Sequence, residues 1–238
     1  MRKGFSKIEF DGEFDAIDPS DVLEYIIEGA SDKDRYPETY EMLQKRYGED
    51  TELMIYILSA TSIRSTLESN VAKALDAFEM FNLEDEQEFI HFMDGICTQL
   101  KSIKRKMNKQ KEFLDGHPLS GRKVTSFSNG MLGDINVVVV DRRLQRAFKI
   151  DRNTSPSNKE YDQVENLVRI IAKAIGREPR QVSAAIRCSI RRKYFKDQKD
   201  YGVALLQQER KRAHRKAEKE YHASIRTLFS EESRVEAA

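Results

Sequence analysis

The chain carries Leu119-Ser-Gly-Arg-Lys-Val-Thr-Ser-Phe127 and, soon after it, a run of four valines that ends at Asp141. A glycine-containing turn directly precedes Lys123, and the apolar run of residues 137–140 directly precedes Asp141. A fold that brings these two side chains together would hold an amine nucleophile beside a carboxylate. We therefore take Lys123 and Asp141, which are 18 positions apart, as the candidate catalytic pair.

Apolar residues recur at helical spacing through most of the remaining chain, which indicates an all-α protein. The pattern predicts helices over 20–29, 36–47, 51–58, 68–81, 84–107, 123–132, 142–150, 161–175, 181–194 and 203–229. In the helix over 181–194, the apolar stripe faces the core and the basic residues, Arg187, Arg191, Arg192 and Lys193, are expected to face outward.

The helical pattern predicts three segments. Residues 1–18 form a short N-terminal arm, residues 19–200 a helical domain, and residues 201–238 a highly charged C-terminal helix. A length of 238 residues and a hydrophobic fraction of 39% suffice for one substantial domain, for which a single core is the simplest expectation.

The net charge of +1 hides a strong division along the chain. Residues 1–100 hold 9 Lys and Arg against 23 Asp and Glu, residues 101–123 hold 8 against 2, and residues 177–226 hold 15 against 6. Basic blocks of this kind are typical of phosphate-binding surfaces, although a solvated helical face would also explain them.

Several classes of protein are not indicated. The chain lacks an apolar run of the ~18 residues that span a bilayer, and Met1-Arg-Lys-Gly-Phe-Ser lacks the apolar part of a signal peptide. We expect a cytoplasmic protein. Cys97 and Cys188 give no disulfide framework, the four histidines have no metal-ligand spacing, and nucleotide-binding and Ser-His-Asp patterns are missing.

The central stretch resembles the helix-hairpin-helix DNA glycosylases, the endonuclease III-like superfamily. The matching positions are Leu119, Gly121, Arg122 and Lys123 in the hairpin, Gly133 in the next loop, and Val140, Asp141 and Arg146 in the last motif. The spacing from lysine to aspartate is similar to that of the superfamily. A second resemblance covers residues 58–75, where members of the superfamily turn a helix end toward the DNA and the base pocket.

The chain also departs from the superfamily. Its hairpin, His117-Pro-Leu-Ser-Gly121, is two residues short, and Arg142-Arg143 stands where the superfamily has a histidine. The four-cysteine iron–sulfur loop of many members is missing, so no cofactor and no metal are expected. The pattern is most similar to small bacteriophage-encoded relatives, for which the compartment would be the host cytoplasm. The resemblance implies that residues 136–140 are extended backbone rather than a sheet strand.

The resemblance implies a DNA glycosylase-like helical domain that binds double-stranded DNA and cleaves the N-glycosidic bond of a damaged or modified base. Lys123 would attack the sugar and add lyase activity, while Asp141 would stabilise positive charge or activate water. The candidate DNA contacts are Ser62, Arg64, Gly121, Arg122, Arg142, Arg143, Arg146, Arg191 and Arg192, with Thr61 as a further candidate near the pocket.

Two alternatives remain open. A catalytically silent phage DNA-binding or protein-interaction module could share the scaffold, with Lys123 as a surface lysine and Asp141 as a helix cap. A partner-binding or assembly role for the C-terminal helix would explain its thin apolar stripe. The sequence indicates neither the base nor the oligomeric state.

Overall fold

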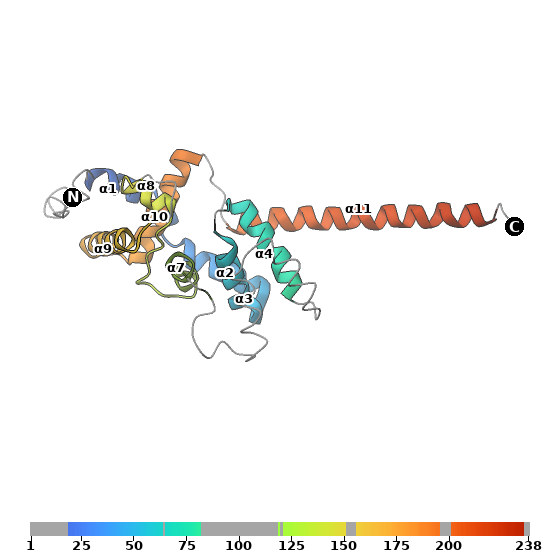
Figure 1. Ribbon diagram of the computed structural model, residues 1–238, viewed down its shortest axis with the longest axis horizontal. Coiled ribbons are helices and arrows are strands. Elements are labelled where there is room, and N and C mark those ends of the chain that lie inside the picture. Colours follow the sequence, from blue (N-terminus) through green and yellow to red (C-terminus); the bar gives the residue numbers. More distant parts are fainter. Residues whose placement is uncertain are drawn as a thin grey trace.

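The computed structural model describes residues 19–63, 65–81, 119, 121–150, 156–195 and 201–235. Every regular element within these residues is a helix, which confirms the all-α prediction for this part of the chain (Figure 1). The predicted N-terminal arm, the predicted helix over 84–107 and most of the hairpin before Gly121 lie outside the described residues.

The helices follow the predicted order. They are α1 (Pro19–Glu28), α2 (Arg35–Tyr47), α3 (Thr51–Thr61), α4 (Leu67–Phe81), α7 (Arg122–Met131), α8 (Arg142–Ala147), α9 (Asn158–Ala174), α10 (Pro179–Phe195) and α11 (Tyr201–Val235). Two short 3-10 helices, η3 (Ala30–Asp32) and η4 (Gly48–Asp50), lie on either side of α2.

Several predicted helix bounds were wrong: α3 runs on to Thr61 instead of ending at residue 58, and α11 extends beyond both ends of the predicted range 203–229. Two further differences have local reasons. Helix α9 begins at Asn158, three residues early, because Ser157 and Glu160 form a capping box in which each side chain accepts from the other's backbone N–H. Helix α8 ends at Ala147, before the predicted residue 150, because the chain turns there and Lys149 adopts a positive φ of 53°.

The buried hydrophobic side chains form two clusters, so the expectation of a single core was wrong. One cluster is built from α2, α3, α4, α7 and the first turns of α11. The other is built from α1, α8, α9 and α10. In Figure 1 the two helix groups lie beside each other along the long axis, with α7 and α10 near the boundary.

The valine run connects the two clusters. Residues 137–140 belong to no helix and no sheet strand, and all four side chains are buried. Val138 and Val140 pack into the cluster around α9 and α10, whereas Val139 packs into the cluster around α3 and α7. This alternation follows from the two-residue period of an extended chain. The run therefore delivers Asp141 to the boundary between the clusters.

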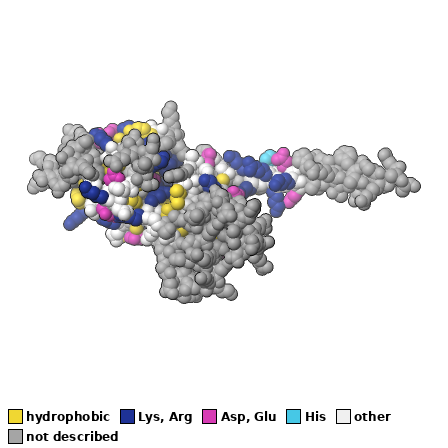
Figure 2. Space-filling model, viewed as in Figure 1, with side chains coloured by type: hydrophobic (Ala, Val, Ile, Leu, Met, Phe, Trp, Pro, Cys, Tyr) yellow, Lys and Arg dark blue, Asp and Glu magenta, His cyan; other side chains and the backbone are white. Residues whose placement is uncertain are grey.

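Helix α11 begins against the domain and then projects away from it (Figure 1). Arg212 forms ion pairs with Asp76 and Glu79 of α4, and Arg46 of α2 pairs with Glu209. With 35 residues and a rise of 1.5 Å per residue, the helix is about 52 Å long. Figure 2 shows Lys and Arg side chains gathered along the part of α11 whose side chains the structure describes. No helix of the described residues has the length and apolarity of a membrane span.

Candidate functional site

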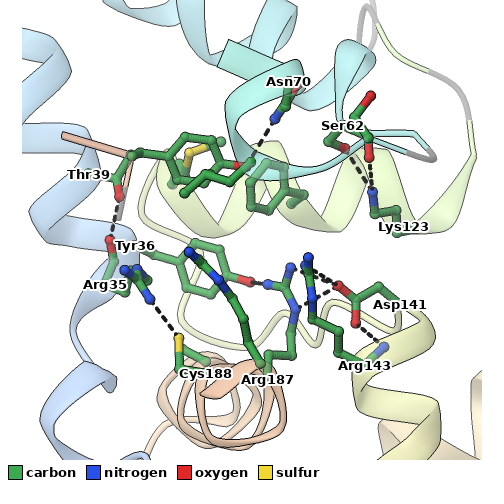
Figure 3. A pocket seen from close by; sticks show the side chains of 17 residues that line it. Arg35, Tyr36, Thr39, Ser62, Asn70, Lys123, Asp141, Arg143, Arg187 and Cys188 are labelled. Carbon is green, nitrogen blue, oxygen red and sulfur yellow. Dashed lines mark hydrogen bonds and ion pairs between the residues drawn. The ribbon is translucent and has the colours of Figure 1, made fainter. Parts of the chain in front are cut away.

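A pocket lies at the boundary between the two clusters, where α2, α3, α4, α7, α8, α10 and α11 approach one another (Figure 3). Its volume of about 80 Å³ is roughly half that of an engineered cavity of about 150 Å³ that holds benzene. It therefore encloses a small group, and a larger ligand would extend out of it. Among its lining residues are a serine and five charged side chains that come from several parts of the chain: Ser62, Lys123, Asp141, Arg143, Arg187 and Arg191.

Lys123 enters the pocket from the first turn of α7. Gly121 directly precedes this helix with φ 91°, a conformation that glycine adopts without strain, and so sets the direction in which α7 starts. The Lys123 Nζ donates to Ser62 Oγ at 2.8 Å and to the Ser62 carbonyl at 3.2 Å. Ser62 caps the C-terminus of α3, which belongs to the second region of resemblance. The two regions of resemblance therefore meet at this hydrogen bond.

Burial lowers the pKa of Lys123, and the nearby guanidinium groups of Arg187 and Arg143 lower it further, whereas Asp141 opposes the shift. The result is a pKa of about 8, well below the ordinary value for lysine. A substantial fraction of the amine is therefore neutral at mildly alkaline pH. A neutral amine has two N–H bonds and one lone pair, and Ser62 offers two acceptors to those N–H bonds.

Asp141 enters the same pocket from the N-cap position of α8. Its Oδ1 accepts from the backbone N–H groups of Arg143 at 2.9 Å and Leu144 at 3.0 Å. Its Oδ2 accepts from Arg187 Nε at 3.0 Å and NH2 at 2.9 Å, and Arg143 NH1 lies 3.7 Å away. The side chain keeps 10% of its exposure, so it is not sealed from the pocket.

Burial raises the pKa of Asp141, but the charges of Arg187, Arg143 and Lys123 and the hydrogen bond from the Leu144 backbone outweigh burial and lower it to about 2. The carboxylate is thus ionised at any physiological pH. A base with such a low pKa accepts a proton from water poorly near neutral pH. Its position and charge suit it better to stabilising positive charge in the pocket.

Arg187 is the main residue of the pocket that the sequence analysis did not find. The prediction that Arg187 and Arg191 face outward was wrong, because the Arg187 side chain is 15% exposed and Arg191 is buried. Arg187 also donates to the Tyr36 hydroxyl, and burial raises the pKa of Tyr36 to about 12, so this hydroxyl stays protonated.

A sequence signal for this face of α10 does exist. Ala184, Arg187, Cys188 and Arg191 follow one another at intervals of three, one and three residues, which places them on one side of a helix. This side of α10 carries small and polar residues, whereas the side that packs into the core carries the apolar stripe. A pattern search that looks for apolar residues therefore does not detect it. The thiol of Cys188 accepts from Arg35 NH1 at 2.9 Å on the same side.

The other candidate residues divide into two groups. Ser62, Arg143 and Arg191 line the pocket with Lys123 and Asp141. The residues that lie outside it are Gly121, Arg122, Arg142, Arg146 and Arg192, whereas Arg64 is outside the described residues. Arg122 pairs with Asp162 and Glu165 of α9, and Arg192 pairs with Asp32. Thr61 lies within the core, where its hydroxyl bonds Asn70 Oδ1 at 2.6 Å.

Residues 29–194 match the family described as "Family of unknown function (DUF7178)". The match covers most of the described helices and includes every residue named above that lines the pocket, apart from the contribution of α11. Neither the curated proteins nor the solved structures gave a match.

Proposed function

Because this chain belongs to the Family of unknown function (DUF7178), its chemistry has to be inferred from the pocket, and we propose that it is a base-excision DNA glycosylase with lyase activity. One observation carries the proposal. Lys123, with a pKa of about 8, lines the same small pocket as the ionised Asp141. The proposal includes the helix-hairpin-helix glycosylase fold, double-stranded DNA as the partner and the cytoplasm as the compartment.

In the proposed reaction, a damaged or modified nucleotide turns out of the duplex so that its sugar reaches the mouth of the pocket. The lone pair of Lys123 Nζ forms a bond to C1′, and the glycosidic bond breaks. The electrons of that bond leave with the base, which then takes up a proton, while the attacking nitrogen loses one. The lone pair of the nitrogen then forms the C=N bond of a Schiff base as the C1′–O4′ bond breaks; the electrons of that bond stay on O4′, which takes up a proton, and the sugar ring opens. Asp141 stabilises the positive charge that builds on the sugar.

The state of Asp141 favours this amine route over activation of water. Both carboxylate oxygens accept hydrogen bonds from α8 or Arg187, and the low pKa makes the group a weak base. The pKa of Lys123, about 8, suits a nucleophile that must be partly deprotonated.

Borohydride trapping on a panel of duplexes, each with one damaged or modified base, tests the proposal. Borohydride reduces the Schiff base to a stable amine, so we expect a covalent protein–DNA adduct with at least one duplex at pH 8. Without borohydride, we expect the same duplex to release its damaged or modified base. An abasic duplex serves as a substrate that needs only the lyase step. A panel on which the full-length protein neither forms an adduct nor releases a base would rule out the excision function.

A catalytically silent DNA-binding or protein-interaction module is the second candidate. Asp141 caps α8 and pairs with Arg187, and these structural roles would keep it in place without any chemistry. Such a module would bind duplexes with the same affinity whether or not Lys123 is present, and it would form no adduct.

A further inference from the structure

Helix α11 carries a basic surface that the proposed reaction does not use. Residues 210–220 hold six Lys and Arg against two Glu, and the side chains of 213–220 are exposed. Two of the basic residues are already paired, because Arg212 contacts two carboxylates of α4 and Lys216 lies 4.0 Å from Glu220. The other basic residues give this part of α11 its positive charge (Figure 2).

Three of these other residues form a line along the helix. Lys211, Arg215 and Lys219 follow one another at intervals of four residues, and we name them the basic stripe. Among the described residues, no carboxylate lies within ion-pair distance of the stripe, although Glu218 directly precedes Lys219 in the chain. Like charges at this spacing destabilise a helix, so an anionic partner along this side of α11 would relieve their repulsion.

The basic stripe continues the side of α11 that faces the pocket. The first residue of the helix, Tyr201, lines the pocket, and its hydroxyl accepts from Asn70 Nδ2 at 3.0 Å. At 3.6 residues per turn, Lys219 follows Tyr201 by five full turns and so projects in the same direction. Arg215 projects about 40° and Lys211 about 80° away from that direction. A ligand that is bound at the pocket and extends along this side of α11 would therefore meet the stripe.

The span of the stripe matches a duplex that extends beyond the pocket. With a rise of 1.5 Å per residue, the stripe lies about 15 to 27 Å from Tyr201 along the helix axis. Successive base pairs of DNA are about 3.4 Å apart, so this distance corresponds to about four to eight base pairs. Over this interval α11 projects away from the domain (Figure 1), and its side chains from Ala213 to Glu220 are exposed.

We propose that α11 is an arm that lies along the phosphate backbone of double-stranded DNA when the target nucleotide is at the pocket. The basic stripe binds phosphates about four to eight base pairs from that nucleotide. Such contacts carry no sequence information, so the arm holds the duplex in place while the pocket selects the nucleotide. Phosphates bound there lie about 15 Å or more beyond Tyr201, farther than the Debye length of about 8 Å, so they have little effect on the Lys123 amine. The inference rests on the proposed function for the target nucleotide, and it adds the surface that binds the rest of the DNA.

Two double variants of the full-length protein test the arm. The test variant combines Arg215→Gln with Lys219→Gln, the two stripe residues that project closest to the direction of Tyr201. The matched control combines Arg210→Gln with Lys173→Gln and removes the same charge. Arg210 follows Tyr201 by two and a half turns and so projects from the opposite side of α11, whereas Lys173 is exposed on α9. Glutamine has a helix propensity close to that of lysine and arginine, so both variants should fold as the wild-type protein does.

The first measurement is the affinity for a duplex of about 30 base pairs with a central abasic site, at several salt concentrations. Each lost phosphate contact lowers the slope of log affinity against log salt by about 0.9, so the test variant should lower this slope by about 2. At about 50 mM salt it should also bind the duplex at least about tenfold more weakly than the wild-type protein. The control should change the affinity by less than about threefold and leave the slope in place.

The second measurement uses a short duplex with three base pairs on each side of the abasic site, closed at both ends by neutral glycol linkers. Its phosphates end before the first residue of the stripe, so the wild-type protein and the test variant should bind it with equal affinity. A loss of the same size on the short and the long duplex would place the contact elsewhere and overturn the arm.

The remaining outcomes separate the arm from the excision function. Equal affinities and salt slopes of the test variant and the control on the long duplex would overturn the arm. Duplex binding that depends on the stripe, without any borohydride adduct, would keep the arm and remove the excision function, whereas an adduct together with no effect of the stripe would do the reverse. If the stripe instead contacts an acidic surface of a second copy of this chain, the wild-type protein should sediment as a dimer without DNA and the test variant as a monomer. Unchanged duplex affinity in that variant would again overturn the arm.

Discussion

Replacing Lys123 with methionine is expected to remove the borohydride-trapped adduct almost completely, by a factor on the order of 10³ or more, since the nucleophile itself is lost. Affinity for the duplex should change by less than about threefold, because one partly neutral amine contributes little to phosphate binding along the DNA. The measurement is the yield of adduct on denaturing gels, with affinity measured on the same duplex.

Lys73→Met is the matched control. Lys73 also donates to a serine, at 3.2 Å to Ser65 Oγ, but it does not line the pocket. This variant should trap DNA as well as the wild-type protein does. Undiminished trapping by Lys123→Met, or equal losses in both variants, would show that Lys123 is not the nucleophile.

The Lys123→Met variant should also be folded, so a loss of adduct can be assigned to chemistry. The folded protein lowers the pKa of Lys123 from the unfolded value, so its positive charge is disfavoured in the folded state. Between about pH 8 and 10.5 the unfolded chain binds more protons at this group, and the stability of the wild-type protein should rise with pH there. Methionine removes this penalty and keeps an apolar side chain of similar length.

Replacing Asp141 with asparagine is expected to lower the free energy of unfolding by about 3–5 kcal/mol, because it leaves the buried guanidinium of Arg187 without its carboxylate. Asparagine is itself a good N-cap, so the hydrogen bonds to the start of α8 are largely kept. The loss therefore reports the charge pair rather than the cap. Urea denaturation at pH 7 measures it.

The control for this variant is Asp162→Asn. Asp162 pairs with Arg122, but at the surface, with 58% of its side chain exposed. Such a pair contributes at most about 1 kcal/mol. Equal losses of stability in the two variants would contradict the buried pair.

The pH dependence of stability tests the same pair between Asp141 and Arg187. The pKa of Asp141 falls from 3.8 to about 2 on folding, so the stabilisation that its charge provides is fully present above about pH 4. It is lost as the pH falls toward 2 and the carboxylate becomes protonated. The difference in stability between the wild-type protein and Asp141→Asn should therefore shrink over this interval.

The sequence predicted the elements of the fold better than their packing. Helical periodicity identified each described α-helix. The run of β-branched residues by itself suggested a buried strand, and the resemblance implied an extended segment outside any sheet. What periodicity does not reveal is that Val138 and Val140 pack on one side and Val139 on the other, which divides the interior into two clusters. Apolar spacing shows that a side chain is buried but not which cluster it joins.

The sequence also predicted only part of the candidate site, because local patterns do not show which distant side chains meet in the folded protein. Lys123 and Asp141 were chosen from their setting in the chain, and both line one pocket. Arg187 was missed because a charged residue of an amphipathic helix is expected opposite the apolar stripe, on the side that usually faces solvent. Its carboxylate partner lies 46 positions away, so the pair becomes evident only when α10 packs against α8.

Titration of the Lys123 amine tests the central claim most directly. NMR of the full-length protein with labelled lysine side chains follows each amine with pH, and Lys123→Met assigns the signal. A Lys123 midpoint at about pH 8, well below the ordinary value of about 10.4 for a lysine, is the expected result. A Lys123 midpoint at about pH 10.4 would show that the amine is an ordinary solvated lysine outside any shared pocket with Asp141, and it would contradict the excision mechanism.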